Sequence, residues 1–322
     1  MTDIDDQIAA VIIGRNEGER LKVCLQSLHG QLAHIIYVDS GSNDGSQEAA
    51  VELGATLVEL DPSLPFTAAR ARNAGLSETV GRNIELIQFV DGDCTVQSDW
   101  IETAAAFLAS NPHAAVACGR RREKFPEKSV YNRLIDKEWN TPVGEVRSCG
   151  GDALIRKSAL DDVGGFNPTL IAGEEPELCV RLRGAGWSVH RLDHEMTLHD
   201  AAIFEFGQWW KRSSRAGHAY AEGFDLHGSP PENHNRAPMK RAVVWGLLIP
   251  FLILALLFVF PLASLVIALL YPMQVARLAW QRRDLAEGFF LTLGKLPEAQ
   301  GIAKYHLNRF FGKRSQIIEY KE

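Results

Sequence analysis

Two aspartates separated by one glycine follow an apolar run at residues 84–90, and they are the leading candidates for metal chemistry. Asp91 and Asp93 stand in FVDGDC with no Lys or Arg beside them. Two neighbouring carboxylates repel each other unless something positive lies between them. Mg²⁺ and Mn²⁺ prefer oxygen ligands, and Mg²⁺ is commonly held by one or two carboxylates together with substrate phosphates. The pair therefore predicts a site for Mg²⁺ or Mn²⁺, although an ordinary Asp-Gly surface turn has the same composition.

Polar residues follow two earlier apolar runs in the same way. Arg15, Asn16 and Glu17 come after IAAVII, and Asp39 ends IIYVD. In an open parallel sheet, ligands bind at the carboxyl ends of the strands. We therefore expect these residues to lie at the same edge of the sheet as Asp91. There, Asp39 is placed to bond the base or ribose of a nucleotide.

Two arginines and an asparagine mark the start of a predicted helix in AARARNAG, namely Arg70, Arg72 and Asn73. The planar fork of an arginine matches the paired oxygens of a diphosphate. We interpret the three residues as a diphosphate-binding group. The alternative is that the arginines face solvent on an ordinary helix, and for Arg70 that alternative stays open.

The elements that must position these residues alternate along the chain. Apolar runs typical of buried strands occupy residues 8–13, 35–38, 55–60 and 84–90, and helical patterns separate them. This alternation predicts an α/β fold with a mostly parallel sheet covered on both faces. We expect residues 119–148 to be irregular and to lie over the sheet. We expect residues 150–223 to form a second compact unit and residues 225–241 to be a linker.

A long uncharged segment follows the linker. Residues 242–276 contain no charged side chain, and Lys and Arg flank both ends. One straight helix of that length would measure roughly 50 Å, against a bilayer core of about 30 Å. Pro261 lies near the middle, so we expect a hairpin of two short spans. The positive-inside rule then places both ends in the cytoplasm. One tilted and kinked span is the alternative.

Composition narrows the classes further. A net charge of −6 argues against a general nucleic-acid-binding protein, which is usually basic. The five cysteines form no C-x-x-C pair, which is typical of reduced thiols in the cytosol. Residues 277–322 carry an excess of basic side chains among apolar ones. That tail predicts either an amphipathic helix on the membrane surface or a helix packed against the catalytic domain.

Six stretches, taken in order, give the chain a family resemblance. They are IIGRNEGERLKVCLQSL, IIYVDSGSNDGS, ARARNAG, FVDGDC, CGGDALIRKSAL and GGFNPTLIAGEEPELCVRLRGAGW. Over residues 8–200 the sequence resembles an inverting family 2 glycosyltransferase with a Rossmann-like, A-type fold. The resemblance implies a nucleotide-diphosphate-sugar donor, with UDP-sugars favoured. It also implies that Asp39 and Glu17 lie near the nucleoside and that Asp93 is the principal metal ligand.

The resemblance assigns a general base as well. The family has an acidic pair, usually Glu-Asp, before a helix rich in Leu and Arg, and this chain has Glu174 and Glu175 there. Glu175 stands in the position of the family's aspartate base. Pro176 suits a first helical position, which predicts Glu175 as the N-cap. The positive helix end favours an ionised carboxylate, as a base requires. Plain helix capping is the alternative, and it is compatible with that role.

Three further residues complete the predicted site. His199 resembles the third metal-ligand position of some relatives, although a lone histidine is more often structural. Asp152 and Trp209 are expected on the acceptor side, with core packing as the alternative for Trp209. The segment QWWKR at residues 208–212 does not match the Q-x-x-R-W motif of processive members. We therefore expect transfer of one sugar in a single inverting displacement.

These observations predict three parts. Residues 1–235 form the catalytic domain, 236–276 a membrane-embedded hairpin, and 277–322 a basic amphipathic cytosolic tail. The expected reaction takes place at the cytoplasmic face of the membrane, on a lipid or lipid-linked acceptor, in the synthesis of an envelope polysaccharide or glycolipid. A nucleotidyltransferase and a non-catalytic membrane scaffold are the alternatives, and no nucleic-acid partner is expected.

Overall fold

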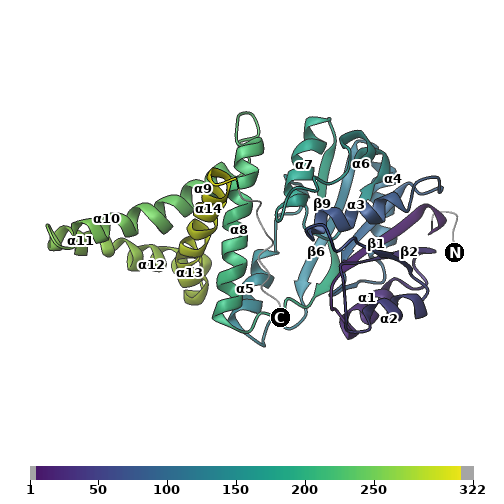
Figure 1. The fold of residues 1–322 in the computed structure, drawn as a ribbon, viewed down its shortest axis with the longest axis horizontal. Coiled ribbons are helices and arrows are strands. Elements are labelled where there is room, and N and C mark those ends of the chain that lie inside the picture. Colours follow the sequence, from purple (N-terminus) through teal and green to yellow (C-terminus); the bar gives the residue numbers. More distant parts are fainter. Residues whose placement is uncertain (1–4, 313–322) are drawn as a thin grey trace. The chain divides into compact units, whose positions relative to one another are not determined.

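The chain divides into two compact units. A computed structural model describes residues 5–312 (Figure 1). The sheet unit comprises Met1–Lys128 and Ile135–Ala202, and the helical unit comprises Ser129–Leu134 and Ile203–Glu322. The sequence-based boundary at residue 235 therefore differs from the structural one. Residues 203–235 belong with the C-terminal helices, because most of them form a long helix that packs against the last described helix.

Four parallel strands form one half of the sheet. They are β3 (Thr56–Glu59), β2 (His34–Asp39), β1 (Ile8–Gly14) and β4 (Leu86–Asp91), in that spatial order. Every residue of β1 is buried, as expected for a central parallel strand covered on both faces. The connecting helices are α1 (Glu19–Leu28), α2 (Ser46–Glu52) and α3 (Ala68–Ser77). The predicted parallel α/β half is confirmed, and it brings the ends of β1, β2 and β4 to one edge.

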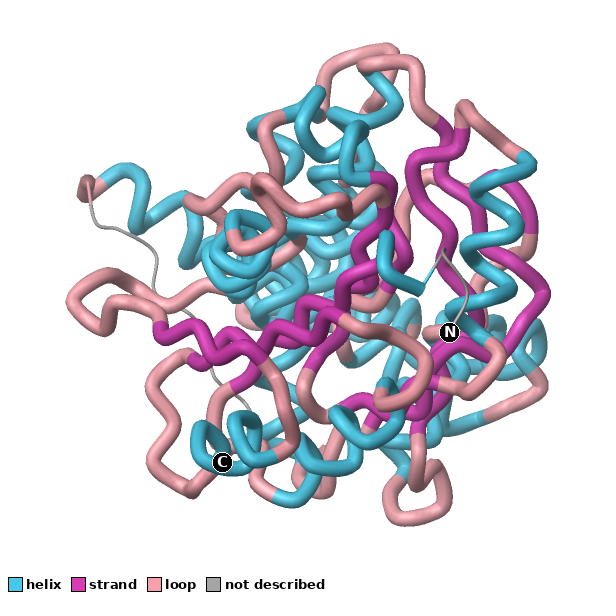
Figure 2. The backbone as a smooth tube through the Cα atoms, turned by 90° about the vertical axis from the view of Figure 1, so that its right-hand side faces the viewer, coloured by secondary structure: helices cyan, strands magenta, loops and turns pink. Residues whose placement is uncertain are grey.

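The other half of the sheet is mixed. β8 (Ala153–Arg156) runs antiparallel to both β4 and β6 (Ala114–Glu123), and β9 (Ser188–His199) runs parallel to β6. Two short strands, β5 (Cys94–Val96) and β7 (Gly144–Glu145), pair antiparallel with β9. Figure 2 traces these strands in magenta with helices beside them. Residues 150–199 thus extend the first sheet, and the expected second compact unit there is wrong.

The expected irregular segment at 119–148 is also wrong in its first part. β6 continues to Glu123 through three consecutive arginines, and α5 (Val130–Glu138) follows. The arginines concealed the strand, because buried charges are rare. Here the neighbouring elements compensate two of them. Arg120 bonds Asp136 at 3.2 Å, and Arg121 lies 2.9 Å from Asp152.

Three more helices cover the sheet. They are α4 (Trp100–Ser110), α6 (Lys157–Val163) and α7 (Glu174–Gly184). Trp100 is fully buried, and its indole N–H donates to Gln88 Oε1 in β4 at 2.9 Å. That hydrogen bond satisfies a buried amide in the strand that leads to Asp91.

The helical unit contains successive helices that begin with α8. They are α8 (Phe206–His227), α9 (Arg236–Val243), the π-helical turn η2 (Val244–Leu248), α10 (Ile249–Leu256), α11 (Pro261–Ala268), α12 (Leu270–Arg282), α13 (Leu285–Leu293) and α14 (Lys295–Phe310). The predicted linker is shorter than expected, because α8 extends to His227 and α9 begins at Arg236. Glycines allow α8 and α14 to approach closely: a β-carbon at Gly217 would overlap the backbone of Glu298, and one at Gly301 that of Ser214.

The charge-free segment forms a helical hairpin. Residues 236–256 and 261–282 form helices of 21 and 22 residues, each long and apolar enough to cross a membrane. At about 1.5 Å per residue each is close to the thickness of a bilayer core. The chain reverses just before Pro261, and Ser264 Oγ donates to the carbonyl of Ile253 at 2.8 Å. The expected hairpin, rather than one kinked span, is what the chain forms.

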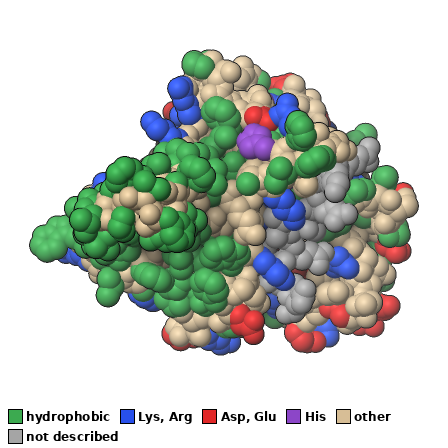
Figure 3. Space-filling view, turned by 60° about the vertical axis from the view of Figure 1, so that its left-hand side comes forward, with side chains coloured by type: hydrophobic (Ala, Val, Ile, Leu, Met, Phe, Trp, Pro, Cys, Tyr) green, Lys and Arg blue, Asp and Glu red, His purple; other side chains and the backbone are tan. Residues whose placement is uncertain are grey.

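The hairpin leaves its apolar side chains exposed. Only 6% of the most apolar window of each helix is buried, and Phe258 at the turn is 90% exposed. Figure 3 shows hydrophobic side chains covering this part of the surface. Exposed apolar surface of this extent marks a site that contacts a membrane or another protein.

The C-terminal tail is helical as far as it is described. α13 packs against α12, and α14 packs against α8 and α9 within the helical unit. Phe310 and Phe311 at the end of α14 are exposed. The basic residues Lys313 and Arg314, on which part of the membrane-surface interpretation rests, lie outside the described residues.

We predict that Gly75→Ala will destabilise the sheet unit. Gly75 is in α3, and a β-carbon there would overlap the side chain of Val11 in β1. Overpacking of this kind costs about 1–3 kcal/mol. Urea unfolding should therefore give a lower midpoint for Gly75→Ala, and adding Val11→Ala should recover part of the loss. Gly184→Ala is the control, because nothing lies within 4 Å of a β-carbon at that helical position. Equal midpoints for Gly75→Ala and Gly184→Ala would contradict the assigned α3–β1 packing.

Candidate functional site

A tight turn after β4 separates the two aspartates of the acidic pair. Asp91 is the last residue of the strand, and the N–H of Gly92 donates to the carbonyl of Ile13 at 2.8 Å. A β-carbon at Gly92 would lie 3.2 Å from that same carbonyl, closer than side chains normally approach. Glycine therefore allows β4 to turn against β1 and to present Asp93 beside Asp91.

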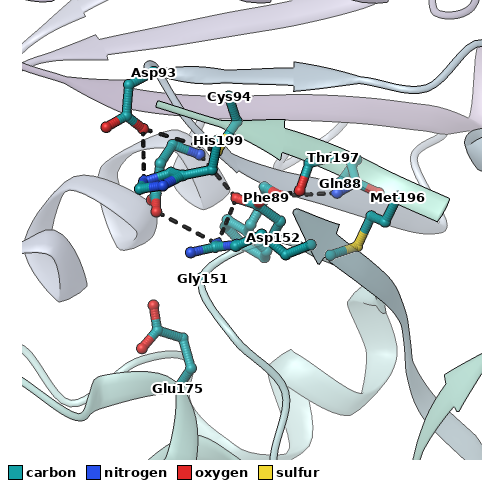
Figure 4. Close-up of polar contacts among 12 residues, drawn as sticks. Gln88, Phe89, Asp93, Cys94, Gly151, Asp152, Glu175, Met196, Thr197 and His199 are labelled. Carbon is teal, nitrogen blue, oxygen red and sulfur yellow. Dashed lines mark hydrogen bonds and ion pairs between the residues drawn. The ribbon is translucent and has the colours of Figure 1, made fainter. Parts of the chain in front are cut away.

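Pairing between β5 and β9 brings a histidine to Asp93. Cys94 lies opposite His199 in the antiparallel register, and His199 Nε2 is 3.3 Å from Asp93 Oδ1. Both side chains are buried, and the ring of Trp139 packs edge to face on the His199 ring, with the ring centroids 4.7 Å apart. Figure 4 shows Asp93, Cys94 and His199 gathered at the ends of their strands. The sequence suggested His199 as a metal ligand, and the structure brings it beside Asp93.

The cluster fits a hard divalent cation. Ligand atoms from Asp91, Asp93, Cys94 and His199 lie within 4.8 Å of one another. Ligands of one octahedral ion at about 2.1 Å lie roughly 3–4 Å apart, so the cluster has a suitable size. Burial raises the pKa of Cys94 well above its usual value, which keeps it a neutral thiol. With no thiolate present, the carboxylate oxygens of Asp91 and Asp93 are the ligands that favour Mg²⁺ or Mn²⁺.

Arg72 connects the acidic pair to the predicted base. Its guanidinium is buried; Nη2 donates to Asp91 Oδ1 at 2.9 Å, while Nη1 lies 2.9 Å from Glu174 Oε1 and 2.7 Å from Glu175 Oε1. One side chain of α3 therefore joins the end of β4 to the start of α7. From the sequence we expected Arg72 to contact a diphosphate, whereas in the structure its terminal nitrogens contact these carboxylates.

The charges of this network are mutually dependent. Burial lowers the pKa of Arg72, but the three carboxylates raise it above its usual value. Burial raises the pKa of Asp91, but Arg72 and Arg121 lower it by more, so that its pKa lies below the usual range. Both groups are therefore charged at neutral pH. The ion pair between them offsets the free-energy cost of burying each charge.

The predicted base lies at the positive end of α7. The helix begins at Glu174 with Gly173 as its N-cap, so Glu175 is inside the first turn. The expectation that Glu175 is the N-cap is wrong by two residues, because Gly173 adopts the left-handed conformation that starts the helix earlier. The side chain of Glu175 is 16% exposed and that of Glu174 only 6%. In Figure 4 the Glu175 carboxylate points towards the group formed by Asp93, Cys94 and His199.

Glu175 has the shifted acidity expected of a proton-transfer group. Burial raises its pKa to about 7; Arg72 opposes this shift, and the nearby Glu174 adds to it. A base is most effective when its pKa lies near the working pH. The environment of Glu175 therefore suits acid–base chemistry near neutrality.

Asp152 supports Asp91 from within the protein. It is fully buried, accepts from the N–H of Asp91 at 3.2 Å and from Thr197 Oγ1 at 2.7 Å, and forms an ion pair with Arg121. The expected place for Asp152 on an acceptor surface does not agree with this burial. Sequence reasoning also missed Arg121, which lies 3.5 Å from Asp91 and over the ring of Trp139. The available signal was that Arg121 follows closely after the apolar run at residues 114–118.

The loops after β1 and β2 are joined to each other. The N–H of Asn16 donates to Ser42 Oγ, and Asn16 Oδ1 accepts from the N–H of Asn43, both at 2.9 Å. Glu17 forms an ion pair with Arg20 at 2.8 Å, and Arg15 is exposed. These contacts give the two loops one shared shape at the edge where we expect the nucleotide.

Asp39 holds the second of these loops in place. Its buried carboxylate accepts from Tyr37 Oη, from the N–H groups of Gly41 and Ser42, and from Gln47 Nε2, at 2.7–3.0 Å. Burial raises the pKa of Asp39, but its hydrogen bonds with Ser42, Gln47 and Gly41 lower it by more, so that the pKa lies below its usual value. The carboxylate therefore fixes residues 40–42.

Two of the predicted diphosphate ligands have other partners. Arg70 donates to the carbonyls of Leu64 and Pro65, and so holds the loop before α3. Asn73 makes two hydrogen bonds to the backbone of Phe166, at 2.7 and 2.9 Å. Both side chains thus stabilise loops around α3, which the sequence pattern of the helix could not reveal.

Trp209 lies in the helical unit. Its ring is buried among other aromatic rings, whose centroids lie 5.0–6.4 Å from its own; they belong to Tyr131, Phe206, Trp210 and Phe290. The core-packing alternative describes this environment.

Known proteins share both the sequence pattern and the fold. Residues 9–164 match the family model for glycosyl transferase family 2. Glycosyltransferase AglE of Haloferax volcanii is 25% identical over 230 residues, which cover 67% of this chain and 74% of that protein. The glucosyl-dolichyl phosphate glucuronosyltransferase of the same organism is 23% identical over 159 residues, covering 43% of this chain and 51% of that protein.

A solved structure extends the comparison to most of the chain. The mannosyltransferase PcManGT from Pyrobaculum calidifontis, in complex with GDP-Man and Mn²⁺, superposes with a TM-score of 0.62. The match covers 92% of this chain and 87% of that one at 18% identity. At this identity the similarity shows the fold, which is the A-type glycosyltransferase fold.

We predict that Arg72→Met will lower stability far more than Arg70→Met. Removing one partner of a buried ion pair leaves uncompensated charge and costs about 3–5 kcal/mol. Arg72 has carboxylate partners and is buried, whereas the guanidinium of Arg70 donates at the surface to backbone carbonyls among residues 5–312. Thermal unfolding of the two variants, two residues apart in one helix, isolates the effect of the ion pairs. Equal losses would contradict the network described above.

Proposed function

Since the chain belongs to glycosyltransferase family 2 and is a glycosyltransferase that uses a nucleotide-sugar donor, we propose the remaining features of its reaction. It transfers one sugar, with inversion, to a lipid-linked acceptor at the cytoplasmic face of a membrane. The transfer requires Mg²⁺ or Mn²⁺. The observation that carries this proposal is the contact of Arg72 with both Asp91 and Glu175, because it holds the metal cluster and the base in one frame.

Asp93, Asp91 and His199 would hold the metal. Their ligand atoms lie within 4.8 Å of one another, and PcManGT was solved with Mn²⁺. When bound, the metal would supply positive charge that stabilises the leaving diphosphate. Asp152 and Arg121 position Asp91 through its N–H and its carboxylate, so the ligand is oriented before substrate arrives.

Glu175 is the proposed base, in preference to Glu174. Its carboxylate is the more exposed of the two, and its pKa of about 7 suits proton removal from an acceptor hydroxyl. The hydroxyl oxygen would form the new bond to the anomeric carbon as the bond to the diphosphate oxygen breaks, and Glu175 would take the proton. A single displacement inverts the anomeric configuration.

The joined loops after β1 and β2 form the proposed nucleotide platform. Asn16 connects them, and Asp39 holds residues 40–42. In this proposal Asp39 orders the loop that contacts the nucleoside and also lies near the nucleoside itself. Arg15 and Glu17 line the entrance of the nucleotide site. UDP-sugars were the expectation from the sequence, but PcManGT was solved with GDP-Man, so both bases need testing.

The exposed hairpin supports a lipid-linked acceptor. Its two helices are apolar and long enough to span a bilayer, and one relative is named for a dolichyl phosphate substrate. A protein held at the membrane meets lipid-borne hydroxyl groups at a high local concentration. Basic residues at both ends of the hairpin favour a cytoplasmic orientation.

A donor screen tests the proposed reaction. Purified full-length protein should release nucleotide diphosphate from one member of a panel of UDP-, GDP- and dTDP-sugars, with a lipid-linked acceptor and Mn²⁺ present. We expect chelation with EDTA and the variant Asp93→Ala each to abolish release. Full turnover in EDTA would refute metal dependence. No turnover and no metal-dependent donor binding, with Asp93→Ala indistinguishable from wild type, would refute the proposed reaction.

The role of Glu175 predicts a definite pH profile. Because the base acts in its unprotonated form, activity should fall as the pH falls through about 7, the pKa that burial gives Glu175. Glu175→Gln should lower kcat by about 10²–10⁴-fold and remove this acidic limb. Glu174→Gln is the comparison, and we expect it to retain the limb. If Glu174→Gln loses the limb while Glu175→Gln keeps it, the assignment of the base is reversed.

Membrane insertion of the hairpin can be tested with one charge. Phe251 is 65% exposed and lies within the first apolar helix. An arginine at mid-membrane costs about 2.5–3.5 kcal/mol in insertion, whereas on a water-exposed helix it costs little. We therefore expect Phe251→Arg to move protein from the membrane fraction to the soluble fraction and to lower transfer to the lipid-linked acceptor. Val80→Arg, at an exposed position in the sheet unit, is the control. Unchanged partitioning of Phe251→Arg would count against an inserted hairpin.

A further inference from the structure

A polar cavity in the sheet unit lies apart from the metal cluster. It has a volume of about 600 Å³ and is bordered by β6, β9, the segment after β5, and residues 140–143. Three arginines line it, namely Arg120, Arg122 and Arg191. Neither the metal-ligand candidates nor Glu175 lines this cavity, so the proposed reaction leaves it unexplained.

Arg191 is a buried cation without a counter-charge. Its residue is 4% exposed, its buried Nε has no hydrogen-bond partner, and no carboxylate within the described chain forms an ion pair with it. A buried charge without a partner is costly, so native proteins normally pair it. Arg191 therefore has the environment of a ligand-binding group whose partner is not part of the fold.

Arg120 adds a second set of donors that is only partly used. Its residue is 6% exposed, and Nη2 bonds Asp136, while the buried Nη1 has no partner among residues 5–312. Burial is the main reason that the pKa of Arg120 lies below its usual value, and Arg122 and Arg191 lower it further. An anion between these arginines would relieve their mutual repulsion.

The acidic residues around the cavity do not supply that anion. Glu195 is 2.8 Å from Arg122, and Asp99 is 3.1 Å from His194. Asp99, Asp193 and Glu195 are exposed, which places them at the rim, whereas Arg120 and Arg191 are buried. The interior of the cavity is therefore positive and its rim mixed.

We propose that this cavity is an oxyanion site that binds the phosphate or carboxylate of a small hydroxylated molecule. Arg191 and Arg120 contact the oxyanion, since guanidinium groups match paired oxygens. Gln97, Asn140 and Thr141 supply neutral donors and acceptors suited to hydroxyl groups. The volume lies within the usual range for small-molecule sites.

One short segment connects the cavity to the candidate metal ligands. Trp139 immediately precedes the lining residues Asn140 and Thr141. The centroid of its ring lies 4.7 Å from the centroid of the His199 ring and 5.4 Å from Arg121 Cζ. An occupant that orders residues 140–143 would therefore also restrict the ring that covers His199. The binding itself depends only on the arginines and does not require the proposed sugar transfer.

Inorganic phosphate is the first probe, applied to the full chain in EDTA at constant ionic strength. Titration calorimetry should give saturable binding, and phosphate at about ten times Kd should raise the Tm by about 2–5 °C. Arg191→Met should lose both responses, and without phosphate it should melt no lower than wild type because it removes an unpaired buried charge. Acetate at matched ionic strength tests the carboxylate arm: binding of only one anion identifies the oxyanion that the site prefers.

Three variants keep the test decisive. Arg156→Met changes another arginine of the same sheet, one that bonds the carbonyls of Ala114 and Leu108, and should keep phosphate binding. Asp93→Asn should also keep it, which separates this site from the metal cluster. If Arg191→Met does not fold, Arg122→Gln at the exposed side of the cavity should weaken phosphate binding by about two- to fivefold. Absence of saturable binding of either anion to wild type, or unchanged binding by both Arg191→Met and Arg122→Gln, would overturn the proposal.

Discussion

The buried guanidinium of Arg72 is the interaction on which the candidate site depends. Burying an arginine is unfavourable unless carboxylates compensate it, and three carboxylates can lie close together only if a cation separates them. In this chain the two requirements meet at one side chain, which contacts Asp91 at the end of β4 and both glutamates at the start of α7. Arg72 therefore sets the separation between the proposed metal ligand Asp91 and the proposed base Glu175.

Support for the site extends inward from this network. Asp152 accepts from the N–H of Asp91, and Arg121 forms ion pairs with both aspartates. Gly151 leaves room for the side chains of Asp91 and Arg72, because a β-carbon at Gly151 would lie 2.8 Å from Asp91 Oδ2 and 2.9 Å from Arg72 Nη2. Asp152 directly precedes β8, which pairs antiparallel with β4, and His199 ends β9, whose pairing with β5 brings it beside Asp93. The mixed half of the sheet thus contributes residues to the candidate site.

The two units of the chain bury apolar surface differently. The sheet unit has a continuous core in which β1 is fully buried and β2 and β4 are mostly buried. The helical unit packs α8 on α14 through glycines but leaves the hairpin side chains exposed. Apolar surface that folding leaves uncovered needs another apolar environment, and a bilayer core matches its length. This is why the family assignment of the sheet unit and the membrane proposal for the helical unit rest on different observations.

The sequence by itself determined the parallel strands, the acidic pair at the end of β4, the acidic pair at the start of α7 and the break at Pro261. These features arise from local patterns: apolar runs, turn residues and the lengths of uncharged segments. Local patterns failed where charge was buried. The arginines of β6 read as a surface segment, and Asp152 read as an accessible group, because their counter-charges come from distant parts of the chain.

Only the tertiary structure decided how the chemical groups are combined. The pairing of His199 with Asp93 depends on β5–β9 register, and the partners of Arg72 come from positions 91, 174 and 175. The unpaired charge of Arg191 became visible only in the fold, where Arg191 is buried and no carboxylate of the described residues forms an ion pair with it. Residue types and spacing limit what each side chain can do, but burial and long-range pairing determine which of those possibilities the fold uses.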